Sequence, residues 1–87
     1  MDTNLSFQEA IAASKTLTKR PSNDDLLKLY ALYKQATEGD VKGKKPGGFD
    51  FKGQAKYAAW EKLVGTSQPE AETSYINLIQ QLLKTHK

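Results

Sequence analysis

Residues 30–40, YALYKQATEGD, place two tyrosines and a lysine within little more than one helical turn, followed by a turn signal. Tyr30, Tyr33 and Lys34 stand at positions i, i+3 and i+4, so their side chains rise from one side of a helix. Gly39 then ends that helix. Taken alone, such a pattern favours tyrosines at the edge of a core and a solvated lysine over a ligand site.

Two helix starts precede this stretch. Ser6, with Glu9 three residues later, has the pattern of a capping box. After a break at Pro21, either Ser22 or Asn23 can cap the second helix. The apolar period indicates the main face of each helix. The residues on it are Phe7, Ala10, Ile11, Ser14 and Leu17 in the first helix and Leu26, Leu29, Tyr30, Tyr33 and Thr37 in the second.

Two more helical segments follow. The third ends at Gly65, and the fourth begins at Ser67, which forms another capping box with Glu70. The residues expected to face the core are Phe51, Ala55, Ala58, Ala59 and Leu63 in the third helix and Ala71, Tyr75, Leu78, Ile79 and Leu82 in the fourth. No segment shows sustained strand alternation, so the sequence predicts an all-α bundle of four helices.

Residues 39–50, GDVKGKKPGGFD, contain four of the six glycines and one proline, which predicts a long connection with little regular structure. Loops of about a dozen residues in compact domains are often functional. Lys42, Lys44 and Lys45 make this connection basic, and the simplest interpretation is a mobile, solvated loop. Such a loop can steer anions without contacting them.

Composition narrows the classes of function. The chain has 87 residues, which suits one domain, and a net charge of +3, which suits a small anionic partner better than tight nucleic-acid binding. It has no cysteine, no apolar run long enough to span a membrane, and no signal-peptide layout in residues 1–7. We therefore expect a cytoplasmic protein.

The sequence offers no catalytic constellation. The sole histidine, His86, lies next to the chain end, and there is no cysteine to act as a nucleophile. No group of histidines, cysteines or carboxylates has metal-ligand spacing. Trp60, the only tryptophan, is expected in the core. We therefore predict a protein that is not an enzyme and holds no metal.

Two segments resemble the acyl-CoA-binding protein family, also called diazepam-binding inhibitor-like. In the first segment, the matching positions are Pro21, Asp24, Leu26, Leu29, Tyr30, Tyr33, Lys34, Gln35, Ala36, Thr37 and Gly39. In the second, they are Phe51, Lys52, Gly53, Ala55, Lys56, Tyr57 and Trp60. With the fourth helix, the resemblance covers nearly the whole chain and implies a single acyl-CoA-binding domain over residues 1–87, with the family's four-helix bundle.

The resemblance also implies a set of ligand-binding residues. Lys34 and Lys56 correspond to lysines that help to bind the phosphates of coenzyme A. Tyr30 and Tyr75 correspond to tyrosines that contact the ligand, and Tyr33 to an aromatic residue at the nucleotide end. Lys15 matches a further lysine that faces the ligand, although a solvated surface charge is an equal alternative.

The resemblance implies that the protein is a carrier of acyl-CoA. The protein would bind medium- to long-chain acyl-CoA thioesters and keep an intracellular pool of them without chemical turnover. Acyl-CoA would be its carried ligand, with no cofactor. We expect a monomer that makes transient contact with acyl-CoA-using enzymes or membranes and does not bind nucleic acid.

Some positions depart from the family pattern. Ile11 stands where a smaller alanine is common, Gln54 where a lysine is frequent, and Tyr57 where the first tryptophan of an aromatic pair is usual. Gly48 and Phe49 occupy the place of an apolar pair. We expect these changes to affect the preference for acyl-chain length, with Ile11 narrowing the groove.

Two other classes of function use the same residues. A weak single-stranded nucleic-acid module would employ the lysines and tyrosines for phosphate and base contacts, with steep salt dependence. An interaction module would accept an amphipathic partner helix in a groove of the bundle. Neither alternative is excluded by the residues themselves.

Overall fold

The computed structural model describes residues 5–17 and 19–85, so His86 and most of residues 1–7 lie outside the described part. It contains four helices, α1 (Phe7–Ser14), α2 (Asn23–Glu38), α3 (Phe51–Glu61) and α4 (Gln68–Thr85), and no strand in the residues described. The predicted all-α fold is confirmed. None of these helices combines the length and apolar character needed to cross a bilayer.

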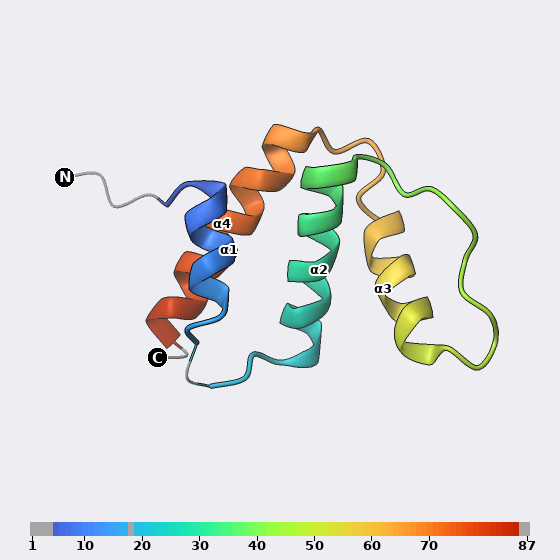
Figure 1. Cartoon of the computed structure of the whole chain (residues 1–87), viewed down its shortest axis with the longest axis horizontal. Coiled ribbons are helices and arrows are strands. Elements are labelled where there is room, and N and C mark those ends of the chain that lie inside the picture. Colours follow the sequence, from blue (N-terminus) through green and yellow to red (C-terminus); the bar gives the residue numbers. More distant parts are fainter. Residues whose placement is uncertain (1–4, 18, 86–87) are drawn as a thin grey trace.

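Helix α2 is the central element of the structure. In the described chain, α2 packs against both α4 and α3, whereas α1 packs against α4 and α3 packs against α2 alone. Figure 1 shows α1 and α4 on one side of α2 and α3 on the other. The two sides of the molecule therefore meet through a single helix.

Side-chain caps set the helix starts close to the predicted positions. Ser6 and Glu9 form the complete capping box of α1. Ser22, rather than Asn23, caps α2 by accepting from the amide of Asp25 at 3.1 Å. The second expected capping box is also present, between Ser67 and Glu70 at the start of α4. These contacts satisfy amides that have no partner within a helix.

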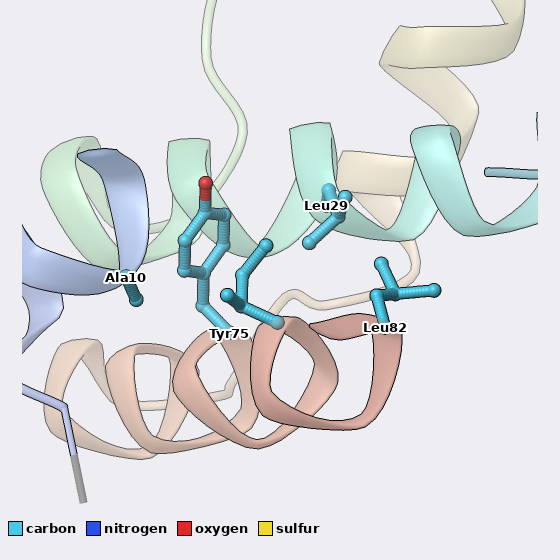
Figure 2. Close-up of a cluster of buried hydrophobic side chains, with 5 residues drawn as sticks. Ala10, Leu29, Tyr75 and Leu82 are labelled. Carbon is cyan, nitrogen blue, oxygen red and sulfur yellow. The ribbon is translucent and has the colours of Figure 1, made fainter. Parts of the chain in front are cut away.

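A buried cluster joins α1, α2 and α4. Its members are Ala10, Leu29, Tyr75, Ile79 and Leu82. Figure 2 shows Leu29 and Leu82 approaching one another from α2 and α4, with the Tyr75 ring rising from α4 beside them. The apolar stripe predicted for the fourth helix is confirmed at Ala71, Tyr75, Ile79 and Leu82.

Three residues expected on buried faces are exposed. Phe51 is 72% exposed because it begins α3, which has only α2 as a helical neighbour in the described chain. Tyr33 is 40% exposed. Thr37 faces solvent, and its hydroxyl donates to the Tyr33 carbonyl at 2.8 Å. The burial predicted for these three residues from the helical period was wrong, because the period does not specify how many neighbouring elements cover a helix.

Gln35 is a fully buried polar residue at the end of α2. Its Nε2 donates to Asp40 Oδ1 at 2.9 Å and to the Thr66 carbonyl at 2.7 Å. Asp40 Oδ1 also accepts from the Gly65 amide at 3.0 Å, and these two hydrogen bonds, the Gly65 contact first, lower the pKa of the Asp40 carboxyl. The contacts join the end of α2 to the α3–α4 turn.

The connection between α2 and α3 is held by three side chains of α3 spaced three residues apart. Each side chain donates a hydrogen bond to a backbone carbonyl of the connection. Trp60 Nε1 donates to the Gly39 carbonyl at 2.9 Å, Tyr57 Oη to the Gly43 carbonyl at 3.3 Å, and Gln54 Nε2 to the Gly47 carbonyl at 2.7 Å. The expected mobile loop is therefore tied to α3 at three carbonyls. Gln54 and Tyr57, which depart from the family pattern, supply two of these ties.

Replacement of Gln35 tests the polar contacts at the end of α2. We expect Gln35→Ala to lower the free energy of unfolding by about 2 to 4 kcal/mol, because it leaves a cavity and removes two hydrogen bonds. Urea denaturation followed by circular dichroism measures the change. The matched control is Gln81→Ala on the exposed face of α4, which should cost less than about 0.5 kcal/mol. Equal losses in the two variants would contradict the assignment.

Burial of Tyr75 predicts a pH dependence. Burial raises the pKa of the Tyr75 phenol, and a hydrogen bond with Ser14 opposes this shift. Above the ordinary tyrosine pKa of about 10 the unfolded chain releases this proton while the folded protein keeps it, so the free energy of unfolding falls as pH rises. Urea denaturation from pH 8 upward should show a shallower fall for Tyr75→Phe than for the wild type. Identical slopes would refute this role of Tyr75.

Candidate ligand-binding site

Three tyrosines meet at one pocket between α1, α2 and α4. Tyr30 and Tyr33 reach it from α2, and Tyr75 reaches it from α4. The pocket has a volume of about 280 Å³, and its remaining lining residues are Ser14, Leu17, Pro21, Leu26 and Leu29. The structure thus brings together all three tyrosines predicted as site residues. We call this space the tyrosine pocket.

Aromatic contacts hold one wall of the tyrosine pocket. The ring centroids lie 5.3 Å apart for Phe7 and Tyr75, 6.3 Å for Phe7 and Tyr33, and 6.5 Å for Tyr33 and Tyr75. Such pairs stabilise beyond their buried area. Phe7 was expected only as a core residue, and its support of the two tyrosines depends on α1 lying beside α2 and α4. Tyr33 therefore has two aromatic neighbours although it is 40% exposed.

The tyrosine pocket offers both apolar surface and hydroxyl groups. A phenol can pack against an aromatic ring or an alkyl chain while its hydroxyl donates to a phosphate or carbonyl oxygen. The Tyr75 phenol keeps that donor at neutral pH, as an ordinary tyrosine does, and burial raises its pKa further. The pocket can therefore accept a ligand with an aromatic and an anionic part.

Lys56 links the tyrosine pocket to a second pocket. Its Nζ lies 5.2 Å from the centre of the Tyr30 ring, a cation–π contact between α3 and α2. The second pocket, of about 470 Å³, lies between the start of α2 and α3 and is lined by Arg20, Asn23, Leu26, Leu27, Phe51, Lys52, Ala55 and Lys56. We call it the α2–α3 groove. The two spaces share Leu26 as a wall.

Lys34 points differently from its two tyrosine neighbours. Its Nζ lies 5.0 Å from the centre of the Trp60 ring and pairs with Glu38, one turn further along α2. The contact with Glu38 is the main cause that raises the pKa of Lys34, so the ammonium stays charged. Lys34 does not line the tyrosine pocket. The i, i+4 spacing of Lys34 and Glu38 could have predicted their pairing, whereas the approach to Trp60 depends on how α3 packs.

Two other residues considered in the sequence lie on α1 or its end. Lys15 is exposed at the C-cap of α1, directly after Ser14, which lines the tyrosine pocket. Ile11 packs against the buried cluster and lines neither the tyrosine pocket nor the α2–α3 groove. Its bulk is therefore accommodated in the core, which does not support a narrowing of the groove.

Taken together, the site combines a cation, phenols and apolar walls. The three tyrosines form its centre, Lys56 approaches it from α3 over the Tyr30 ring, and two adjoining pockets offer apolar surface. Lys34 is not brought into the tyrosine pocket, because it lies over Trp60 and pairs with Glu38. Among the described residues, no group of three or more histidine, cysteine or carboxylate side chains lies close enough to hold a metal ion. The arrangement suits an amphiphilic anion with an aromatic group.

Comparison with known sequences identifies relatives. Residues 4–79 match the family described as Acyl CoA binding protein. Acyl-CoA-binding protein homolog 1 of Caenorhabditis elegans is 51% identical over 79 residues, which cover 91% of this chain and 92% of that protein. Acyl-CoA-binding protein of Saccharomyces cerevisiae is 52% identical over 77 residues, which cover 88% of each.

Solved structures agree with the sequence relatives. The crystal structure of Oryza sativa Acyl-CoA-Binding Protein 2 is similar with a TM-score of 0.86 and 44% identity, covering 91% of this chain and 88% of that one. The solution structure of Acyl Coenzyme A Binding Protein from yeast has a TM-score of 0.74 and 50% identity, covering 92% and 93%. The family match, the sequence relatives and the fold together show that this chain belongs to the acyl-CoA-binding protein family.

Proposed function

We propose that this chain binds medium- to long-chain acyl-CoA thioesters as one acyl-CoA-binding domain spanning residues 1–87. The observation that carries the proposal is the meeting of Tyr30, Tyr33 and Tyr75 at one pocket, with Lys56 over the Tyr30 ring, in a chain of this family. The relatives named above are described as acyl-CoA-binding proteins. The same ligand fits the chemistry of the site.

The coenzyme A part of the ligand would occupy the tyrosine pocket and its basic edge. Tyr30, Tyr33 and Tyr75 would contact the adenine ring and nearby polar atoms. Lys34, Lys56 and Lys15 would hold the phosphates. An ammonium has three donor hydrogens, so Lys34 can donate a hydrogen bond to a phosphate oxygen while it keeps its contact with Glu38.

The acyl chain would lie in the α2–α3 groove. This space is larger than the tyrosine pocket, about 470 against 280 Å³, and adjoins it at Leu26. Leu27 and Ala55 supply further apolar wall. Transfer of each methylene from water to such a wall is favourable by about 0.8 kcal/mol before the cost of ordering the chain. Headgroup and tail would therefore contribute separately to affinity.

The protein is then a binding protein and not an enzyme, and acyl-CoA is its cargo rather than a cofactor. It would act as an intracellular carrier and pool former, shielding a detergent-like thioester from membranes. We further propose a cytoplasmic monomer that contacts acyl-CoA-using enzymes or membranes transiently and does not bind nucleic acid. The modest net charge of +3 agrees with a small anionic ligand.

Lysine replacements test the phosphate contacts. Lys34→Ala and Lys56→Ala should each weaken acyl-CoA binding by about 1.5 to 3 kcal/mol and reduce its salt dependence, because each removes a charge-assisted contact. Titration calorimetry at low and high salt measures both effects. Lys44→Ala, in the α2–α3 connection, is the matched control and should change affinity by less than about 0.5 kcal/mol. If Lys44→Ala lowered the affinity for acyl-CoA as much as the other two replacements, the phosphate site would lie elsewhere.

A series of ligands tests the carrier function. Affinity should rise by orders of magnitude from free coenzyme A through medium- to long-chain acyl-CoA and then level off when the groove is filled. Free fatty acid should bind poorly because it lacks the phosphates. Calorimetry gives the affinities and a stoichiometry of one, and thiol release over hours should stay at background. Equal affinity for coenzyme A and its palmitoyl ester would refute a lipid carrier.

A further inference from the structure

The positive charge of this chain is concentrated in one segment. Residues 41–56 contain five of the thirteen basic residues and one of the ten acidic residues, so the segment carries +4 and the rest of the chain −1. The one acidic residue, Asp50, caps α3 by accepting from the Gly53 amide at 2.9 Å. Residues 41–50 of the segment run along the outer side of α3, away from α1 and α4, and residues 51–56 form the first half of α3 (Figure 1).

The same segment exposes two phenylalanines. Phe49 is 98% exposed and Phe51 is 72% exposed, the two highest values among the large apolar residues described as exposed. Phe49 lines none of the pockets described above, and no core contact accounts for its position. Four exposed lysines lie near this pair in the sequence, and they are Lys42, Lys44, Lys45 and Lys52. We call these six residues the aromatic–basic edge.

Hydrogen bonds and helix α3 position the aromatic–basic edge. The connection that carries its loop lysines is tied to α3 at the carbonyls of Gly39, Gly43 and Gly47, and Lys42, Lys44 and Lys45 lie between these ties. Phe51 and Lys52 belong to the first turn of α3. A surface that is already ordered loses less conformational entropy when it binds a partner.

We propose that the aromatic–basic edge docks on the anionic surface of a lipid bilayer. Lysines gain from the negative surface potential of such a membrane, and exposed aromatic side chains insert at the boundary between headgroups and acyl chains. Phe51 and Lys52 also line the α2–α3 groove, so docking places the mouth of that groove against the bilayer. A fully exposed phenylalanine beside lysines suits an interfacial partner better than an acidic protein, which would engage the charges alone.

This inference deepens the proposed function, since it rests on an acyl chain as the cargo of the groove. A tail could then pass between bilayer and groove without full exposure to water. Vesicle binding is measured with the ligand-free protein and acyl-CoA binding without vesicles, so failure of the docking surface and failure of the proposed function are distinguishable.

Cosedimentation of the full chain with vesicles tests the docking surface. The protein should bind vesicles of phosphatidylcholine mixed with phosphatidylserine, less so at high salt, and bind pure phosphatidylcholine weakly. Phe49→Ser should lower the partition coefficient roughly tenfold. The Lys44→Ala/Lys45→Ala double variant should lower it roughly 25-fold, at about fivefold per lysine. Both variants should keep the wild-type affinity for acyl-CoA in calorimetry.

Two control variants carry the same changes elsewhere on the surface. Val64→Ser replaces an apolar residue that is 55% exposed, and Lys84→Ala removes an exposed charge from α4. Neither should alter vesicle binding. Absence of binding to the anionic vesicles, equal binding to both kinds of vesicle, or equal losses in the controls would overturn the inference. Binding to polyglutamate as tight as to vesicles and insensitive to Phe49→Ser would also overturn it, in favour of an acidic protein partner.

Discussion

The packing of α2 against α4 is the contact on which the rest of this structure depends. Among the described helices, the backbone of α1 packs against α4 and that of α3 against α2, and the Phe7 and Tyr33 rings add a side-chain contact between α1 and α2. The two sides of the molecule are therefore joined mainly at the α2–α4 interface. Leu29 from α2 meets Tyr75 and Leu82 from α4 there (Figure 2). Ile79 of α4 belongs to the same cluster and is fully buried. A domain of this size has little apolar area in reserve, so loss of one interface is expected to separate the two sides.

The candidate site lies across this interface. Tyr75 comes from α4, Tyr30 and Tyr33 from α2, and Lys56 from α3, which the interface positions only indirectly. Tyr75 serves both the core and the tyrosine pocket, because its side chain belongs to the buried cluster and also lines the pocket. A ligand that contacts all three helices would therefore stabilise their arrangement, since binding to the folded state alone raises the free energy of unfolding.

The basic residues discussed above fall into two groups with different surroundings. Lys34 lies over the Trp60 ring and Lys56 over the Tyr30 ring, and these are the two lysines for which we propose phosphate contacts. The loop lysines are instead exposed beside Phe49, on a connection that α3 holds by three hydrogen bonds to backbone carbonyls. Ligand recognition and approach to a charged surface can therefore be altered by different substitutions. Gln54 and Tyr57, which depart from the family pattern, each donate a hydrogen bond to a carbonyl of this connection.

The sequence by itself determined the features that depend on neighbours three or four residues away. The capping boxes at Ser6 and Ser67, the helical periods and the shared side of Tyr30 and Tyr33 are of this kind, because backbone geometry brings such residues together in any helix. Family resemblance extended the prediction to Lys56 and Tyr75. Only the tertiary structure decided that Phe51 is exposed, that Gln35 is buried and that Lys34 lies over Trp60. These outcomes depend on which segments, distant in sequence, pack against each helix, and a local pattern carries no information about that packing.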